Sequence, residues 1–150
     1  MIRIQIIDDD RWCAEAIKAM LMDIETDMFF DIVSTPEPID GFDLYIIDNE
    51  FTSGDHAVGM ATTIRVRNPD AMIMACSGTM NRVKFKELIN AGCNAVVEKG
   101  SAKDRATMIN VIERFAVMKR SSITQSSIGS VMADIRGILS TWNARMESLN

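Results

Sequence analysis

Short apolar runs alternate along this chain with segments whose apolar residues recur at helical spacing, and this alternation constrains the fold more than any other feature. Five of the runs are rich in β-forming residues, at positions 2–7, 29–33, 44–47, 72–76 and 95–98. Strands that alternate with helices indicate βαβ units and a parallel sheet. Because strands so uniformly apolar are typical of a sheet covered on both faces, the sequence predicts a three-layer, doubly wound α/β domain over residues 1–120.

The segments between the runs carry signals for helix starts. Apolar residues recur at helical spacing over positions 11–23, 55–67 and 82–91, and again after Ser101. Asp10 is suited to cap the first of these helices, because a carboxylate accepts hydrogen bonds from the free backbone amides at a helix start. Ser101 and Asp104 have the spacing of a capping box at the start of the last one.

Residues 121–150 are predicted to form a separate segment. SSITQSSIGS (121–130) is a serine-rich hinge, and an amphipathic helix is expected over about 128–149. Its apolar residues have heptad spacing and form one seam: Ile128, Val131, Ile135, Ile138 and Trp142. A homodimer through residues 128–149, packing onto the chain's own domain, or docking of a partner would each cover this seam. We favour the first two, and expect the large Trp142 side chain to be buried in either.

The composition argues against several classes of function. The formal net charge is −5 without a basic cluster, so nucleic acid is not expected as a direct partner. One histidine and three widely spaced cysteines do not suit a zinc site or a disulfide framework. No apolar run approaches the roughly 18 residues of a membrane span, and MIRIQIIDDD does not resemble a signal peptide. We therefore expect no membrane insertion and a cytoplasmic location.

Polar residues suited to chemistry follow four of the five runs. They are Asp8, Asp9 and Asp10, then Asp48, then Ser77 and Gly78, and finally Lys99. Ligands of open α/β sheets bind at the carboxyl ends of the strands, so these groups are expected to converge. Clustered carboxylates need a counter-charge, and their hard oxygens suit Mg²⁺. A metal, a carboxylate nucleophile, a lysine and hydrogen-bond donors are the parts required for phosphoryl transfer onto a carboxylate.

In these motifs the chain resembles the receiver domain of two-component response regulators, of the chemotaxis-regulator type. The resemblance covers about residues 1–119 and depends on IIDDD, LYIIDNE, CSG and AGCNAVVEKG, in that order and spacing. It implies a flavodoxin-like parallel sheet of five strands in the order 2-1-3-4-5. It also implies a signalling protein that is not an enzyme, beyond catalysing its own aspartyl phosphorylation and dephosphorylation.

The resemblance implies a metal-binding role for the acidic residues at the strand ends. Asp48 matches the phospho-acceptor. Asp8 and Asp9 match the acidic pair that binds Mg²⁺. Asp48 itself and the backbone carbonyl of Glu50 would complete the protein's share of the metal ligands. Asp10 matches no ligand and is expected only to cap its helix.

The remaining strand-end residues match the groups that hold the phosphoryl group in the family. Ser77 matches the switch hydroxyl, Gly78 the donor of a backbone amide, and Lys99 the lysine that pairs with the phosphoryl oxygens. A histidine kinase or a phosphotransfer protein would supply the phosphoryl group. Output is expected through contact with a downstream protein, on a face formed by the fourth helix, fifth strand and fifth helix of the family.

Three positions depart from the family pattern. Val96 replaces an aromatic residue that turns inward on activation in the family, and a branched aliphatic side chain cannot report the position of Ser77 by the same movement. Gly100 replaces a proline that follows the lysine in cis; because a cis bond without proline costs about 3 kcal/mol, this loop is expected to be trans or looser. Thr52 also stands where a proline is usual.

The connection between the second and third strands is a larger departure. Only TPEPIDGFD (35–43) is available where the family has a full helix. The link must cover roughly 20 Å, passing two strand spacings while it returns along a strand. Residues 36–42 span about 23–25 Å when extended but only about 10 Å as a helix. The second helix is therefore expected to be missing or reduced to one turn, and the C-terminal helix is a candidate to cover the region it vacates.

Two other functions stay open at this point. A degenerate receiver would keep the fold as a scaffold or binding module without being phosphorylated. A Mg²⁺-dependent phosphohydrolase with an aspartyl nucleophile would carry a DxDx pattern on its first strand. Asp8 and Asp10 have that spacing, but the chain lacks the substrate-capping segment of such enzymes.

Overall fold

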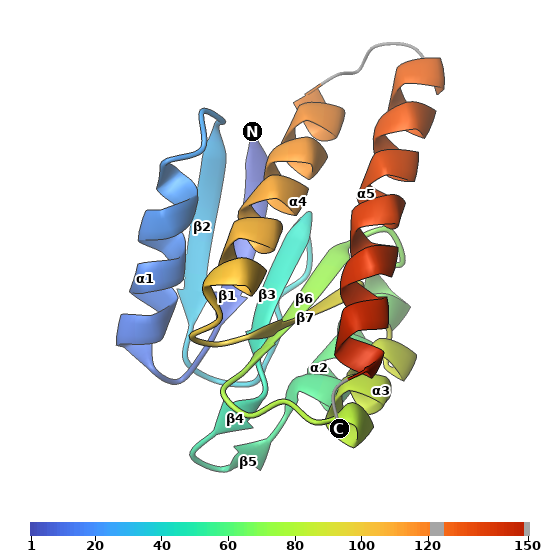
Figure 1. Cartoon of the computed structure of the whole chain (residues 1–150). Helices are drawn as coiled ribbons and strands as arrows, with labels where there is room; N and C mark the ends of the chain where they lie inside the picture. The colour runs from blue at the N-terminus through green and yellow to red at the C-terminus, as the bar shows by residue number, and fades with distance from the viewer. Residues whose placement is uncertain (121–124, 149–150) are drawn as a thin grey trace.

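The computed structural model describes residues 1–120 and 125–148, and its centre is a five-stranded parallel sheet (Figure 1). The strands of this sheet are β1 (Ile2–Ile7), β2 (Met28–Val33), β3 (Leu44–Asp48), β6 (Met72–Ser77) and β7 (Ala95–Glu98). Their order is β2-β1-β3-β6-β7. Counted along the chain, this is the predicted order 2-1-3-4-5, so the flavodoxin-like fold is confirmed.

Within residues 1–120 and 125–148, four helices cover the two faces of the sheet and a fifth lies at its edge. They are α1 (Arg11–Met22), α2 (Ala57–Arg67), α3 (Arg82–Asn90), α4 (Ala102–Arg120) and α5 (Gln125–Glu147). Figure 1 shows α1 and α4 on one face and α2 and α3 on the other. The central strands β1, β3 and β6 are almost entirely buried between these layers, as their continuous apolar sequences predicted. No helix within the described residues is long and apolar enough to cross a membrane.

The link between β2 and β3 contains no helix. This confirms the prediction, made from the length of residues 36–42, that the second helix is missing or reduced to one turn. Residues 34–43 are all described and cross the sheet as irregular chain. Side chains from the sheet hold this chain in place: Gln5 Oε1 accepts from the Ile39 amide at 3.0 Å, and the Tyr45 hydroxyl donates to Ile39 O at 2.8 Å. Because no helix covers it, the edge strand β2 stays half-exposed, and Phe29 is 45% exposed.

A small antiparallel hairpin, β4 (Glu50–Phe51) and β5 (Gly54–Asp55), lies between β3 and α2. The sequence indicated only a turn there, with a helix from about residue 55. The helix begins instead at Ala57, after the hairpin. This hairpin orients Glu50 and Thr52, both of which reach the candidate site.

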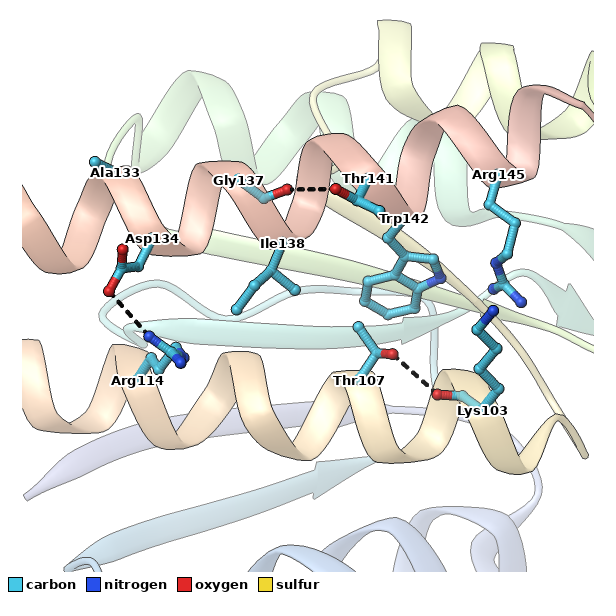
Figure 2. Close-up of a pocket in the computed structure, with 10 residues that line it drawn as sticks. All are labelled: Lys103, Thr107, Arg114, Ala133, Asp134, Gly137, Ile138, Thr141, Trp142 and Arg145. Atoms are coloured by element: carbon cyan, nitrogen blue, oxygen red, sulfur yellow. Dashed lines mark hydrogen bonds and ion pairs between the residues drawn. The ribbon is translucent and has the colours of Figure 1, made fainter.

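Helix α5 packs against α4, α3 and β7, at the opposite edge of the sheet from β2 (Figure 1). The suggestion that it covers the region vacated by the second helix was therefore wrong. Only residues 121–124 separate it from α4, and a link that short keeps consecutive helices side by side. Ile135, Leu139 and Trp142 are buried in this contact. Figure 2 shows Ile138 and Trp142 pointing from α5 towards α4.

The boundaries of the C-terminal segment differ in part from those predicted. Helix α5 begins at Gln125, so residues 125–130 of the predicted hinge are helical. The first four residues of the predicted hinge, 121–124, lie outside the described residues, and so do residues 149–150. Ile128 and Val131 belong to the predicted seam, but their side chains also lie outside what the structure describes.

Candidate functional site

Asp8, Asp48 and Lys99 meet at the carboxyl edge of the sheet because their strands are parallel and in register. Ile7 pairs with Ile47, so Asp8 and Asp48 follow at the same level of neighbouring strands. Lys99 extends from the end of β7 across this edge. Its Nζ lies 2.8 Å from Asp48 Oδ1 and 3.1 Å from Asp8 Oδ2. The predicted convergence of these three residues is thus present in the fold.

Both carboxylates are almost fully buried, Asp8 at 2% and Asp48 at 3% exposed. Burial is the main reason why the pKa of Asp48 is raised; Asp8 raises it further, and Lys99 opposes both. Burial lowers the pKa of Lys99, but its contacts with Asp48 and Asp8 outweigh this and raise the pKa overall. The ammonium is therefore firmly charged, and one cation faces two buried carboxylates.

Asp9 stands beside this pair and is held by Thr52. Asp9 Oδ2 accepts from both the backbone amide and the hydroxyl of Thr52, each at 2.7 Å. These two hydrogen bonds are the main cause of the lowered pKa of Asp9. A proline at position 52 would lack both donors, so the departure noted in the sequence supplies an anchor for a metal-ligand candidate.

The three acidic residues fit a divalent cation. One oxygen from each of Asp8, Asp9 and Asp48 can be chosen so that all lie within 4.8 Å of one another. With a single lysine opposite, a second cation would offset the remaining negative charge of the cluster. Hard carboxylate oxygens are the ligands Mg²⁺ prefers. The predicted contribution of the Glu50 carbonyl stays a prediction.

Asp10 caps α1 and takes no part in this cluster. Its carboxylate accepts from the amides of Trp12 and Cys13, at 2.9 and 3.3 Å. Hydrogen bonds from the Cys13 thiol and these amides lower the pKa of Asp10. Asp10 is therefore the helix cap that the sequence predicted.

Ser77 and Gly78 lie at the end of β6, as predicted, but they bind the side chain of Glu50. Ser77 Oγ is 2.9 Å from Glu50 Oε1, Gly78 N is 2.8 Å from Oε2, and Thr79 N is 3.2 Å from Oε1. Ser77 Oγ is also 2.9 Å from Thr79 O, so two acceptors share its one hydrogen. We call the Ser77 hydroxyl and the Gly78 and Thr79 amides the switch donors. Lys84 Nζ adds a positive charge 3.4 Å from Glu50 Oε1.

These contacts determine the ionisation of Glu50. Burial, the largest single influence, raises its pKa, but the switch donors and the charge of Lys84 together lower it. Glu50 therefore presents a carboxylate anion to the switch donors.

The functional groups that the sequence missed are the Glu50 carboxylate, Lys84 and Thr52. The sequence assigned Glu50 only a backbone carbonyl, because the small hairpin that turns its side chain towards β6 was not predicted. Thr52 could have been recognised from the sequence, because it has a backbone N–H at a position where the family usually has proline, which has none. Lys84 lies on α3 and had no signal that distinguished it from other surface lysines.

The loop after Lys99 has a backbone that suits glycine. No cis peptide bond occurs in the described residues, so the bond from Lys99 to Gly100 is trans. Gly100 has a φ of +89°, a value that side chains rarely adopt. The glycine in place of the family's proline therefore permits a different turn.

Several solved structures with the same architecture are response regulators or their receiver domains. The fold is that of a response-regulator receiver domain. A receiver domain protein from Methanospirillum hungatei aligns with a TM-score of 0.64 at 18% identity, over 76% of this chain and 93% of that chain. The Mn²⁺-bound response regulator Rcp1 aligns with a TM-score of 0.62 at 14% identity, over 83% of this chain and 98% of that chain.

One of these structures is a longer protein, the response regulator DrrB of Thermotoga maritima. The alignment has a TM-score of 0.64 at 15% identity and covers 77% of this chain. The chain spans about half of DrrB, 52% of its length. No family model matches the sequence, and no curated protein matches it. At these identities the comparisons establish the receiver fold alone.

Proposed function

We propose that the chain is a response regulator receiver whose Asp48 accepts a phosphoryl group from a histidine kinase or a phosphotransfer protein. A carboxylate oxygen of Asp48 forms a bond to phosphorus while the bond from phosphorus to the donor's imidazole nitrogen breaks. The bonding electrons leave with the imidazole, and the product on this chain is an acyl phosphate. Apart from forming and losing this acyl phosphate, the chain is not an enzyme.

The observation that carries this proposal is the position of Asp48 between a lysine and two further aspartates. Its carboxylate ends β3 at the edge where receiver folds bind their ligands, 2.8 Å from Lys99 Nζ. Lys99 is suited to pair with an oxygen of the incoming phosphoryl group, because it already bridges two negative groups. Asp8 shares Lys99 and keeps it directed into the site.

Mg²⁺ is the proposed cofactor, held by Asp8, Asp9, Asp48 and the Glu50 carbonyl. When bound, it would neutralise negative charge that develops on the transferred group. Asp8 and Asp48 contribute buried oxygens, and Thr52 keeps Asp9 oriented towards them. This set of hard oxygen donors excludes metals that require sulfur or imidazole ligands.

Output is proposed to be contact with a downstream protein rather than with nucleic acid, in the cytoplasm. The surface formed by α3, β7 and α4 adjoins Lys99, but α5 packs on all three of these elements. Val96 is fully buried in β7 and cannot swing as an aromatic residue would. We therefore propose that the signal changes how α5 sits on this surface.

Intact mass spectrometry tests the proposal directly. Incubation with Mg²⁺ and acetyl phosphate should add one phosphoryl group to the wild-type chain. Asp48→Asn should gain none, since its amide is not a nucleophile for this reaction, and omission of Mg²⁺ should abolish the gain. A phosphoryl group that persists in Asp48→Asn would mean that another residue is the acceptor.

A degenerate receiver that acts as a scaffold is a second candidate, and one observation favours it. The switch donors are already occupied by Glu50, so the chain could hold a fixed conformation without phosphorylation. It would then gain no phosphoryl group from acetyl phosphate or from any histidine kinase.

A further inference from the structure

The carboxylate of Glu50 is surrounded as a bound anion would be. Three switch donors and the ammonium of Lys84 converge on its two oxygens. Charge-assisted hydrogen bonds of this kind are among the stronger ones in proteins. Two of these groups, the Ser77 hydroxyl and the Gly78 amide, are also those expected to receive the oxygens of a phosphoryl group on Asp48, so they have two candidate anions.

A comparison with Asp55 separates Glu50 from an ordinary surface ion pair. Both carboxylates belong to the small hairpin, and both pair with Lys84, at 3.4 Å from Glu50 and 3.5 Å from Asp55. The Asp55 side chain is 61% exposed, and in the described part of the chain it makes no hydrogen bond to the switch donors. The Glu50 side chain is 35% exposed and reaches all three.

Gly78 is fitted closely to the Glu50 carboxylate. A Cβ atom at position 78 would lie only 2.8 Å from Glu50 Oε2, closer than real Cβ contacts come. Glycine therefore lets the carboxylate approach the backbone amide directly.

Glu50 and a phosphoryl group cannot both satisfy the switch donors. The Gly78 amide has one hydrogen, which would have to leave Glu50 in order to bind a phosphoryl oxygen. The Ser77 hydroxyl also has one hydrogen, and it is already divided between Glu50 Oε1 and Thr79 O. We propose that Glu50 is the resident anion of the switch donors, which a phosphoryl group on Asp48 must displace; this inference rests on the proposed function. Glu50 thereby slows phosphoryl acceptance and holds the loop after β6 against the small hairpin without phosphorylation.

The test compares phosphoryl acceptance in Glu50→Ala with that in the matched control Asp55→Asn. Both changes remove a carboxylate that pairs with Lys84, but only the first empties the switch donors. At saturating Mg²⁺, the initial rate with acetyl phosphate should rise roughly tenfold or more in Glu50→Ala, since one charge-assisted hydrogen bond alone corresponds to about that factor. Asp55→Asn should stay within about twofold of wild type, as expected for an exposed pair.

Binding of beryllofluoride, a phosphoryl mimic, gives an equilibrium measurement of the same competition. Its affinity in the presence of Mg²⁺ should rise in Glu50→Ala by a factor similar to the rate. Glu50→Gln keeps an acceptor oxygen but loses the charge, and should fall between wild type and Glu50→Ala. Thermal unfolding of each variant checks that it is folded. If the contacts of Glu50 only stabilised the fold, Glu50→Ala would lower the stability without increasing the affinity for beryllofluoride.

The outcomes distinguish this inference from the proposed function. Phosphorylation of wild type, Glu50→Ala and Asp55→Asn at equal rates would overturn the inference and leave Asp48 as the acceptor. Phosphorylation of both proteins, but faster in Glu50→Ala than in wild type and Asp55→Asn, would support both. No phosphorylation of any variant, together with no binding of beryllofluoride, would overturn the proposed function and the inference with it.

Discussion

Arg145 of α5 donates to the carboxylate of Asp104 in α4, and this ion pair holds the C-terminal helix against the domain. The Asp104 side chain is 1% exposed and that of Arg145 is 34% exposed. The other carboxylate oxygen of Asp104 accepts from the Glu98 amide at 3.0 Å. Since Glu98 immediately precedes Lys99, one buried carboxylate connects α5 to the strand end that carries the lysine of the candidate site.

Replacement of Arg145 by glutamine should therefore destabilise the protein. It leaves the Asp104 carboxylate buried without its cation, and breaking a buried pair in this way costs several kcal/mol. Because Arg145 is one-third exposed, we expect a smaller loss, about 1–3 kcal/mol in the free energy of unfolding. Urea unfolding measures this loss.

Arg114→Gln is the matched control for this change. Arg114 also joins α4 to α5, through Asp134 at 3.0 Å, but the two side chains are 42% and 57% exposed. Loss of such an exposed pair should cost no more than about 0.5 kcal/mol. Equal losses in the two variants would show that burial of Asp104 does not matter.

The sheet was predictable because its strands follow simple rules. Runs such as LYII and MIMAC are apolar along their whole length, which is typical of strands covered on both faces, and the spacing of the runs leaves room for one helix between most pairs. The absence of a helix between β2 and β3 could be predicted from the length of the link between them alone. The position of α5 did not follow, because an apolar seam indicates that something covers it without indicating what.

The candidate site was predictable where it depends on strand ends and not where it depends on side-chain direction. Parallel register alone brings Asp8, Asp48 and Lys99 together. Glu50 was predicted only as a metal ligand through its backbone carbonyl, but its side chain turns towards Ser77. The cause is the small hairpin, in which only four residues pair and which has no strong sequence signal. Local irregular structure of this kind escapes arguments based on periodicity.

Thr52→Val should weaken the binding of Mg²⁺. Valine keeps the backbone amide but removes the hydroxyl that binds Asp9 Oδ2 at 2.7 Å. Loss of a group that orients a metal ligand typically costs 10- to 100-fold in affinity, and we expect about tenfold because the amide bond persists. Isothermal titration with Mg²⁺ measures the change.

Ser53→Ala serves as the control for the Thr52 substitution. Ser53 is the next residue of the hairpin, and its hydroxyl lies 2.8 Å from His56 Nε2, in contact with no acidic residue of the cluster. Its removal should leave the Mg²⁺ affinity within about twofold of wild type. A comparable weakening in both variants would contradict a specific role for Thr52.

Lys99→Met should destabilise the metal-free protein strongly. It leaves Asp8 and Asp48 buried, at 2% and 3% exposed, without the cation that both contact. We expect a loss of about 3 kcal/mol in the free energy of unfolding, measured in urea with EDTA. Because Mg²⁺ binds the folded state, it should restore part of that loss.

The exposed Lys86 on α3 provides the comparison for Lys99. Lys86→Met should change the free energy of unfolding by less than about 0.5 kcal/mol, with or without Mg²⁺. If Mg²⁺ stabilised Lys99→Met no more than it stabilises Lys86→Met, the buried carboxylates would not be the cause of the loss.

The burial of Trp142 makes a prediction about the size of the protein in solution. Trp142 is 4% exposed within a single chain, and its ring lines the groove between α4 and α5 (Figure 2). A second copy is therefore not needed to cover it, and light scattering at several concentrations should give the mass of a monomer. Trp142→Glu should keep that mass while lowering stability; Val66→Glu, at a residue 77% exposed, should change neither. A dimer that dissociates only in Trp142→Glu would assign the helix to pairing between chains.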